Sequence, residues 1–185
     1  KSIILQMSSF AFDVAVADFM RSLCFGGQLV ICPKDALSDQ TSLIKLIKTH
    51  NINTADFVPA VLDPLTSDEH VAKDIFAHFN LLICGSDMWS MANAKRLLAA
   101  CPPSCRILHA YGLTETVVDA LYFDVAALGE NNNTLPLGIP VGNGFVEICD
   151  KEMRPVVVGS EGEICIGGSC LADEYLGLPD LTEQK

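Results

Sequence analysis

Short apolar runs with almost no polar alternation recur along this chain up to about residue 117. Four of them have the length of a β-strand, at residues 29–32, 55–58, 81–84 and 106–110. A parallel sheet is covered by helices on each side, so its buried strands read in this way. Stretches with helical patterning lie between the runs, at residues 13–23, 42–48 and 90–100. Strands that alternate with helices predict an α/β fold with a doubly wound, mostly parallel sheet and flanking helices.

The pattern changes after about residue 118. Residues 145–149 and 163–166 alternate polar and apolar side chains, and glycines punctuate the sequence around them. Such alternation is typical of strands with one exposed face, and no clear helix is expected in this half. We therefore expect an α/β subdomain over residues 1–117, followed by an antiparallel or barrel-like β portion of the same core over residues 118–185.

The charge of the chain argues against two classes of partner. Its 185 residues include 23 Asp and Glu against 12 Lys and Arg, which gives a net charge of −11. Nucleic acids and anionic membranes attract clusters of Lys and Arg, so neither is expected as a partner. No apolar run approaches the roughly 18 residues of a membrane span. Most of the eight cysteines lie among apolar residues, as free cysteines do, which favours a reducing cytoplasmic setting.

Residues 109–116, His-Ala-Tyr-Gly-Leu-Thr-Glu-Thr, directly follow an expected buried strand. Ligands of doubly wound sheets bind beyond the carboxyl ends of the strands, where this segment would lie. Tyr111 supplies a ring, Gly112 allows close backbone approach, Thr114 carries a hydroxyl and Glu115 a carboxylate. Such a set could stack on a base, donate to a phosphate and hold Mg²⁺. The residue chemistry alone leaves an ordinary polar turn as an equal alternative.

This segment resembles the Tyr-Gly-x-Thr-Glu motif of the adenylate-forming superfamily, which includes the adenylation domains of nonribosomal peptide synthetases, acyl-CoA synthetases and luciferases. Three further stretches are similar to motifs of that family in the right order, at residues 8–13, 136–143 and 162–168. The resemblance covers almost the whole chain, which is identified as an internal piece of the large N-terminal core of an adenylation domain. His109, Leu113 and the pair at 173–174 depart from the usual asparagine, proline and Arg-Gly.

The resemblance implies a nucleotide site. Tyr111 is expected to stack on adenine, Thr114 to contact phosphate and Glu115 to hold Mg²⁺, with Thr114 and Glu115 as the catalytic residues. The other nucleotide-binding positions that it implies are Gly85, His109, Ala110 and Gly112. The phosphate loop, the ribose-binding aspartate and the C-terminal domain with its catalytic lysine would lie outside these 185 residues, so the isolated chain is expected to be inactive.

The reaction implied by the resemblance consumes ATP. An amino acid and ATP give an aminoacyl-adenylate and pyrophosphate, and the aminoacyl group then passes to the phosphopantetheine thiol of a carrier protein. Carrier and condensation domains of a parent synthetase are therefore the expected partners. Catalysis of this kind rests mostly on positioning and on electrostatic stabilisation of phosphates.

The resemblance also implies a pocket for the substrate side chain. Its expected lining is Asp13, Val14, Ala17, Asp56, Leu82, Cys84, Ala110, Val118 and Asp119. Asp13 is expected to pair with the substrate α-ammonium, because a buried carboxylate needs a partner, although an aspartate there also suits a helix N-cap. Two further carboxylates, Asp56 and Asp119, would suit a guanidinium, so arginine or another basic amino acid is the predicted substrate.

Two alternatives remain open at this point. The first is an acyl-CoA-type ligase for an uncharged carboxylate, which Leu113 favours and Asp13 opposes. The second is a non-catalytic domain that retains only the fold.

Overall fold

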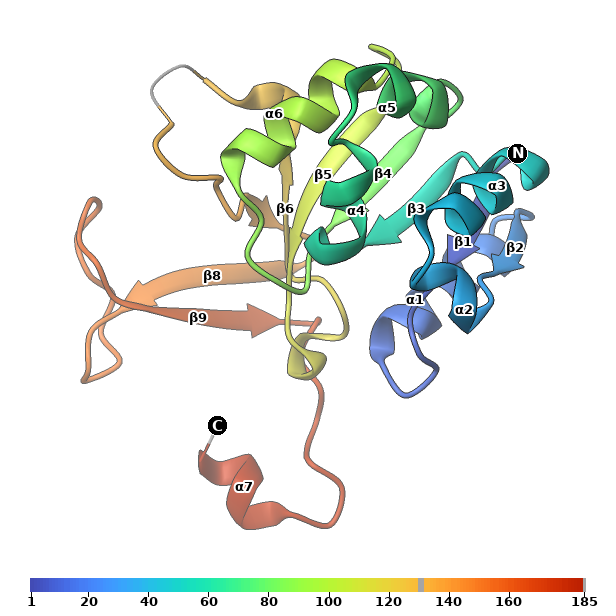
Figure 1. The fold of residues 1–185 in the computed structure, drawn as a ribbon. Helices are drawn as coiled ribbons and strands as arrows, with labels where there is room; N and C mark the ends of the chain where they lie inside the picture. The colour runs from blue at the N-terminus through green and yellow to red at the C-terminus, as the bar shows by residue number, and fades with distance from the viewer. Residues whose placement is uncertain (130–131, 185) are drawn as a thin grey trace.

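A seven-stranded sheet forms the centre of the computed structural model, which describes residues 1–129 and 132–184 (Figure 1). Its strands, in the spatial order β2-β1-β3-β4-β5-β6-β7, are β1 (Ile3–Gln6), β2 (Gln28–Ile31), β3 (Thr54–Phe57), β4 (Leu81–Cys84), β5 (Arg106–Tyr111), β6 (Leu121–Asp124) and β7 (Ile139–Pro140). The strands from β1 to β5 pair in parallel, whereas β6 runs antiparallel to β5 and β7 antiparallel to β6. The predicted mostly parallel α/β fold is confirmed.

Helices connect the parallel strands. They are α1 (Asp13–Leu23), α2 (Lys34–Leu37), α3 (Gln40–His50), α4 (Pro59–Leu65), α5 (Glu69–Phe76) and α6 (Met91–Ala100). The helices expected at residues 13–23, 42–48 and 90–100 correspond to α1, α3 and α6. Side chains that accept hydrogen bonds from the first turn begin three of the helices, Asp39 for α3, Asp68 for α5 and Ser90 for α6.

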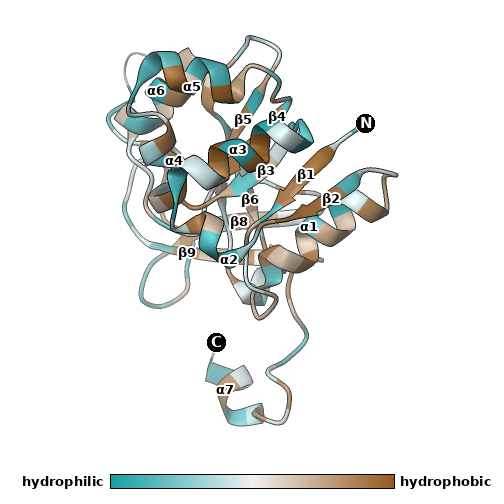
Figure 2. Ribbon diagram, turned by 45° about the vertical axis from the view of Figure 1, so that its right-hand side comes forward, coloured by the Kyte–Doolittle hydropathy of each residue, from teal (hydrophilic) through white to brown (hydrophobic). Residues whose placement is uncertain are grey.

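The main core lies between the sheet and the helices α3 to α6. Leu82 of β4, Leu43 of α3 and Leu97 of α6 belong to this core and are at most 2% exposed. A smaller cluster on the other face of the sheet contains Ile83 and Leu108. Helix α1 lies on this second side and packs against β1 and β2. Figure 2 shows the apolar residues gathered on β1 and mixed with polar residues on the helices, as a buried sheet covered by amphipathic helices requires.

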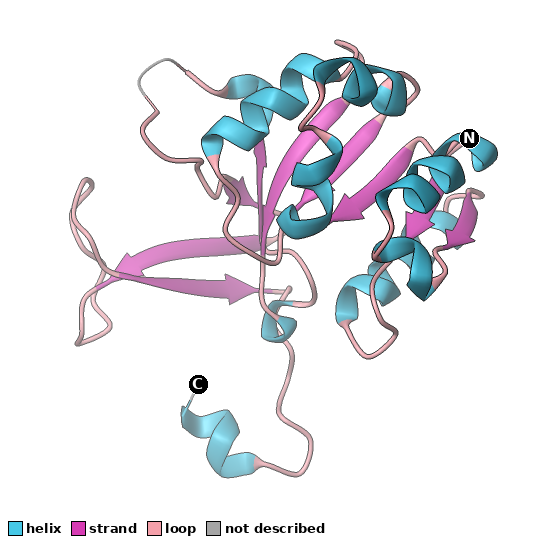
Figure 3. Ribbon diagram, in the orientation of Figure 1, coloured by secondary structure: helices cyan, strands magenta, loops and turns pink. Residues whose placement is uncertain are grey.

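A separate two-stranded antiparallel sheet follows, made of β8 (Gly144–Cys149) and β9 (Glu163–Gly168) (Figure 3). The expectation of no helix in this half was wrong, because α7 (Pro179–Gln184) lies near the end of the chain. Its six residues are too few to display a helical apolar period, and none of them is buried. No helix in the described ranges is long and apolar enough to cross a membrane.

Candidate active site

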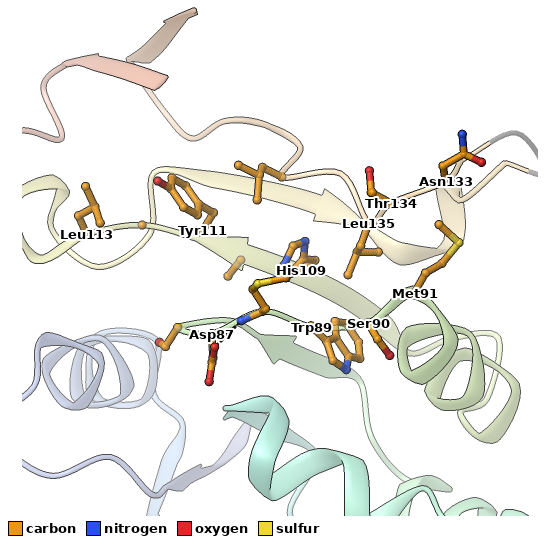
Figure 4. A pocket seen from close by; sticks show the side chains of 15 residues that line it. Asp87, Trp89, Ser90, Met91, His109, Tyr111, Leu113, Asn133, Thr134 and Leu135 are labelled. Carbon is orange, nitrogen blue, oxygen red and sulfur yellow. Dashed lines mark hydrogen bonds between the residues drawn. The ribbon is translucent and has the colours of Figure 1, made fainter. Parts of the chain in front are cut away.

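A cavity of about 680 Å³ opens where β4 and β5 end. The loop at 86–91, the last residues of β5 and the segment 133–135 form its walls, and Figure 4 shows His109 and Tyr111 on β5 facing the same space as Trp89 and Met91. This is the edge at which doubly wound sheets bind ligands. The volume and the aromatic lining suit a ligand with a flat heterocyclic base.

Two contacts hold the rings of this cavity in place. His109 is buried, and its Nδ1 lies 2.8 Å from the carbonyl oxygen of Pro136. A carbonyl only accepts, so Nδ1 carries the hydrogen and Nε2 of the neutral ring is left as an acceptor. The indole of Trp89 lies 6.2 Å from the imidazole between ring centroids, and its Nε1 donates to Asp63 of α4 at 3.1 Å.

Most of the expected nucleotide-binding residues meet at this cavity. Its lining includes His109, Ala110, Tyr111 and Gly112. Gly85 directly precedes the loop at 86–91. A Cβ at Gly85 would lie 2.8 Å from the carbonyl oxygen of Ala110. The close approach of the ends of β4 and β5 therefore requires a glycine here.

A second cavity of about 640 Å³ lies on the other side of the end of β5. Its lining includes the predicted substrate residues Asp13, Val14, Asp56 and Val118. Three residues line both cavities, namely Ser86, Gly112 and Leu113. The two cavities therefore meet at Gly112, an arrangement that can hold two reactants with their reacting ends together.

Asp13 is the first residue of α1 but not its N-cap, a position that Phe12 occupies without a side-chain hydrogen bond. The Oδ1 atom of Asp13 accepts a hydrogen bond from the backbone N–H of Val14 at 2.8 Å. Because a carboxylate has several acceptor sites, this bond leaves capacity for a cationic ligand in the cavity that Asp13 lines.

A charged cluster lies beside this second cavity. Arg21 of α1 donates from Nη1 to Asp56 at 2.9 Å and from Nη2 to Asp119 at 3.0 Å. The Tyr122 hydroxyl donates to Asp119 and lies 3.2 Å from Nη2 of Arg21. Asp18, one turn before Arg21, is 3.6 Å from Nη1. The structure thus brings Asp56 and Asp119 together, and it places an arginine of the chain between them.

Burial and mutual repulsion shift the pKa values in this cluster. Burial, and after it the neighbouring Asp56, raise the pKa of Asp18 to about 7 against the opposing effect of Arg21. Burial also raises the pKa of Asp56, to about 6. The pKa of Tyr122 rises because of burial and the nearby Asp119. One guanidinium therefore does not fully offset the carboxylates around it.

The structure separates other members of the predicted pocket from these acids. Asp56 pairs with Ile83 across β3 and β4, so Leu82 and Cys84 point to the opposite face of the sheet. Both are fully buried in the core that packs against α3 to α6. Ala110 belongs to the cluster on the same face as Ile83, and Ala17 is half-buried on α1.

The loop between β5 and β6 has an unusual backbone. Val117 and Val118 have φ angles of 55° and 76°, which β-branched residues rarely adopt. The Thr116 hydroxyl donates to the Leu113 carbonyl and accepts from the Leu113 N–H, both at 2.9 Å, and so closes the preceding turn, η1 (Thr114–Thr116). Strained backbone of this kind gathers at functional sites, and here it sets the position of Asp119.

A third cavity, of about 340 Å³, surrounds the predicted catalytic pair Thr114 and Glu115. The backbone N–H of Ala172 donates to the Glu115 carbonyl at 2.8 Å, and the Tyr175 hydroxyl donates to the Glu115 side chain. Both pair members are exposed and offer oxygen atoms, the ligand type that Mg²⁺ prefers. Within the described ranges, no group of three or more His, Cys, Asp or Glu side chains is placed to hold a metal ion.

Sequence reasoning missed Arg21, Asp18 and Tyr122. One signal was available, because Asp13, Ala17 and Arg21 follow the i, i+4, i+8 spacing of a single helix face. This spacing predicts that Arg21 lies on the same face of the helix as the pocket residue Asp13. Tyr175 follows the stretch at 162–168 that resembles a family motif, but its contact with Glu115, 60 residues away, was not predicted.

Comparisons with known proteins show the family of the chain. The sequence pattern of the family described as AMP-binding enzyme matches residues 1–176. Tyrocidine synthase 3 of Brevibacillus parabrevis is 40% identical over 185 residues, a match that covers 98% of this chain and 3% of the relative. Across the first curated relatives, the chain spans between 3% and 7% of their length.

Solved structures share the fold. IdnL1 has a TM-score of 0.90 at 19% identity, and the match covers all of this chain and 38% of that one. The AMPPNP-bound form of the nonribosomal peptide synthetase FmoA3 has a TM-score of 0.86 at 24% identity, covering 98% of this chain and 20% of that one. The family match and the relatives confirm the resemblance that the motifs predicted, and the solved structures support the fold.

Proposed function

Because the chain belongs to the AMP-binding enzyme family, we propose that it forms the amino-acid- and nucleotide-binding part of an adenylation domain in a nonribosomal peptide synthetase. The observation that carries this proposal is the pair of cavities that meet at Gly112, one lined by aromatic rings and the other by carboxylates. The domain joins the carboxyl group of an amino acid to the α-phosphate of ATP and releases pyrophosphate.

Each cavity has its own task in this proposal. Tyr111 stacks on the adenine ring, and the Nε2 atom of His109 accepts from the base, since its other nitrogen faces Pro136. Asp13 binds the substrate α-ammonium in the second cavity and directs the carboxyl group toward Gly112. Holding the two reactants in contact supplies much of the catalysis in such a reaction.

Thr114 and Glu115 act on the phosphates. Thr114 donates its hydroxyl to a phosphate oxygen, and Glu115 would hold Mg²⁺ with Tyr175 orienting its carboxylate. A Mg²⁺ ion held there would neutralise charge on the phosphates. Residues 1–117 serve as the subdomain that binds substrate and adenine, and residues 118–185 as the β-rich continuation of the same core. A carrier protein, through its phosphopantetheine thiol, and a condensation domain are the partners that complete the cycle.

We propose a basic amino acid, arginine first, as the substrate. Asp18, Asp56 and Asp119 lie around the single guanidinium of Arg21, and Asp56 also lines the second cavity. An excess of carboxylate in such a buried place favours a cationic ligand. Neutral side chains are disfavoured because they leave that charge uncompensated.

Pyrophosphate exchange in the full-length synthetase tests the proposal. Arginine, lysine, leucine and simple carboxylic acids are compared for wild type, Asp119→Asn and the control Asp74→Asn, whose carboxylate is an exposed partner of Lys48. Arginine should be preferred at this module. Asp119→Asn should lower its kcat/KM roughly 30-fold to several thousand-fold, the range for removing one member of a buried charge pair. Leucine or a simple acid as the preferred substrate of wild type, or an arginine preference that survives in Asp119→Asn, contradicts the basic-substrate proposal.

A further inference from the structure

Arg21 stands between the substrate cavity and the interior of the protein. Its Nη1 atom is 2.9 Å from Asp56, which lines the cavity, and 3.6 Å from Asp18, which lies on its own helix. The side chain of Arg21 is 24% exposed, whereas that of Asp18 is 2% exposed. One guanidinium nitrogen is therefore shared between a carboxylate at the cavity and a deeply buried one.

One oxygen atom of the buried Asp18 carboxylate lacks a hydrogen bond. The Oδ1 atom of Asp18 has no hydrogen bond to any described residue, although it is out of contact with solvent. A buried carboxylate oxygen without a donor is costly, so the cluster holds an unused acceptor next to Arg21. The contact of 3.6 Å is too long to serve as that bond.

A small movement would supply it. Nη1 needs to approach Asp18 by about 0.7 Å, the difference between the 3.6 Å and 2.9 Å contacts. Arg21 and Asp18 are three residues apart on α1, a spacing that lets oppositely charged side chains meet.

We propose that Arg21 is a resident counter-ion for Asp56 and Asp119. When the substrate binds, its cationic side chain pairs with these two acids, and Arg21 pairs with Asp18 instead. This inference rests on the basic substrate proposed above. With the cavity empty, Arg21 partly neutralises the two acids. With substrate bound, two cations share three carboxylates, and Asp18 gains the donor that it lacks. Arg21 is thus a specificity residue that competes with the substrate.

Two variants of the full-length synthetase have opposite expected effects. Asp18→Asn weakens the withdrawn position of Arg21, so the KM for arginine in pyrophosphate exchange should rise roughly ten- to a hundredfold with kcat nearly unchanged. Arg21→Gln removes the competitor, so the KM for arginine should fall. Asp74→Asn and Arg96→Gln remove exposed charged groups and should leave both constants unchanged.

The direction of the KM change separates this role from a structural one. An arginine that only supported the fold would raise KM or lower kcat when removed. A higher KM in Arg21→Gln, or an unchanged KM in Asp18→Asn, therefore overturns the inference. If Arg21→Gln yields no folded protein, the nearly isosteric Asp18→Asn decides.

Hydrogen exchange of the peptide 13–23 gives a readout that is independent of the substrate. Arg21→Gln should speed hydrogen exchange of this peptide, because the cluster loses its counter-ion. Millimolar guanidinium chloride, which supplies a free guanidinium ion, should slow the exchange of this variant. It should have no such effect on wild type or on Arg96→Gln. Wild type that activates no basic amino acid contradicts the proposed substrate, while rescue by guanidinium still supports Arg21 as the counter-ion. Absence of rescue, like an unchanged KM in Asp18→Asn, refutes the counter-ion role and leaves the substrate proposal standing.

Discussion

Gly112→Ala should disable the site through a single methyl group. A Cβ at this position would lie 1.8 Å from the carbonyl oxygen of Val118 and 2.7 Å from Cα of Asp119. Contacts of a Cβ below 3.0 Å essentially do not occur, so the Val118 carbonyl has to move by more than 1 Å. That residue already has a φ of 76° and leads directly to Asp119, so the shift reaches the acid that contacts Arg21.

A misplacement of about 1 Å costs roughly a hundredfold in rate, so kcat/KM for arginine in pyrophosphate exchange should fall by about that factor. Overpacking adds a loss of about 1–3 kcal/mol in stability. Gly129→Ala is the matched control, because its nearest neighbour is the flexible side chain of Asn132 at 3.3 Å. Gly112→Ala that keeps more than half of the wild-type kcat/KM would refute the reasoning.

Three other predictions concern separate parts of the site. Glu115→Gln should lower turnover 10²–10³-fold, because removal of such an electrostatic contact costs about 2.7–4 kcal/mol, whereas the control Glu161→Gln should leave turnover unchanged. Pyrophosphate exchange by Glu115→Gln at the wild-type rate would count against the metal role. The isolated 185 residues should support no exchange, and measurable arginine-dependent exchange would contradict this. Asp18 has a raised pKa of about 7, and the charged groups that act on it are Asp56, Arg21 and Asp119. The folded state therefore holds the Asp18 proton more tightly than the locally unfolded state does. The free energy of local unfolding of α1 should fall as pH rises from about 4 to 7. Hydrogen exchange of residues 13–23, corrected for intrinsic rates, should show this fall with pH, and Asp18→Asn should reduce it.

Local signals were enough to predict the fold. Each apolar run was continuous and of strand length, so β3, β4 and β5 could be placed within a residue or two. Helices α4 and α5 were missed: α4 contains Pro59 and Pro64, which are helix-breaking residues, and α5 has only eight residues.

The site was predictable only where it is local in sequence. The Tyr111 to Glu115 segment follows one strand, so its residue types could be read directly. Hydrogen bonds in the Arg21 cluster join residues up to 101 positions apart, and no spacing in the sequence indicates that the two acids already have a partner. The faces of Leu82 and Cys84 depended on the pairing of β3 with β4, which only the assembled sheet specifies.

The contacts between Glu115 and the segment after β9 affect how the protein unfolds. Ala172 and Tyr175 contact Glu115 from an exposed segment, while Arg21, Asp56 and Asp119 are held between α1 and the large sheet. Exposed segments open with less free energy than core strands, so residues 169–184 should form a separate, weaker cooperative unit. A brief opening of that unit would loosen the phosphate end of the site and leave the amino-acid end intact. Recognition of the side chain and chemistry on the phosphates would then fail at different temperatures.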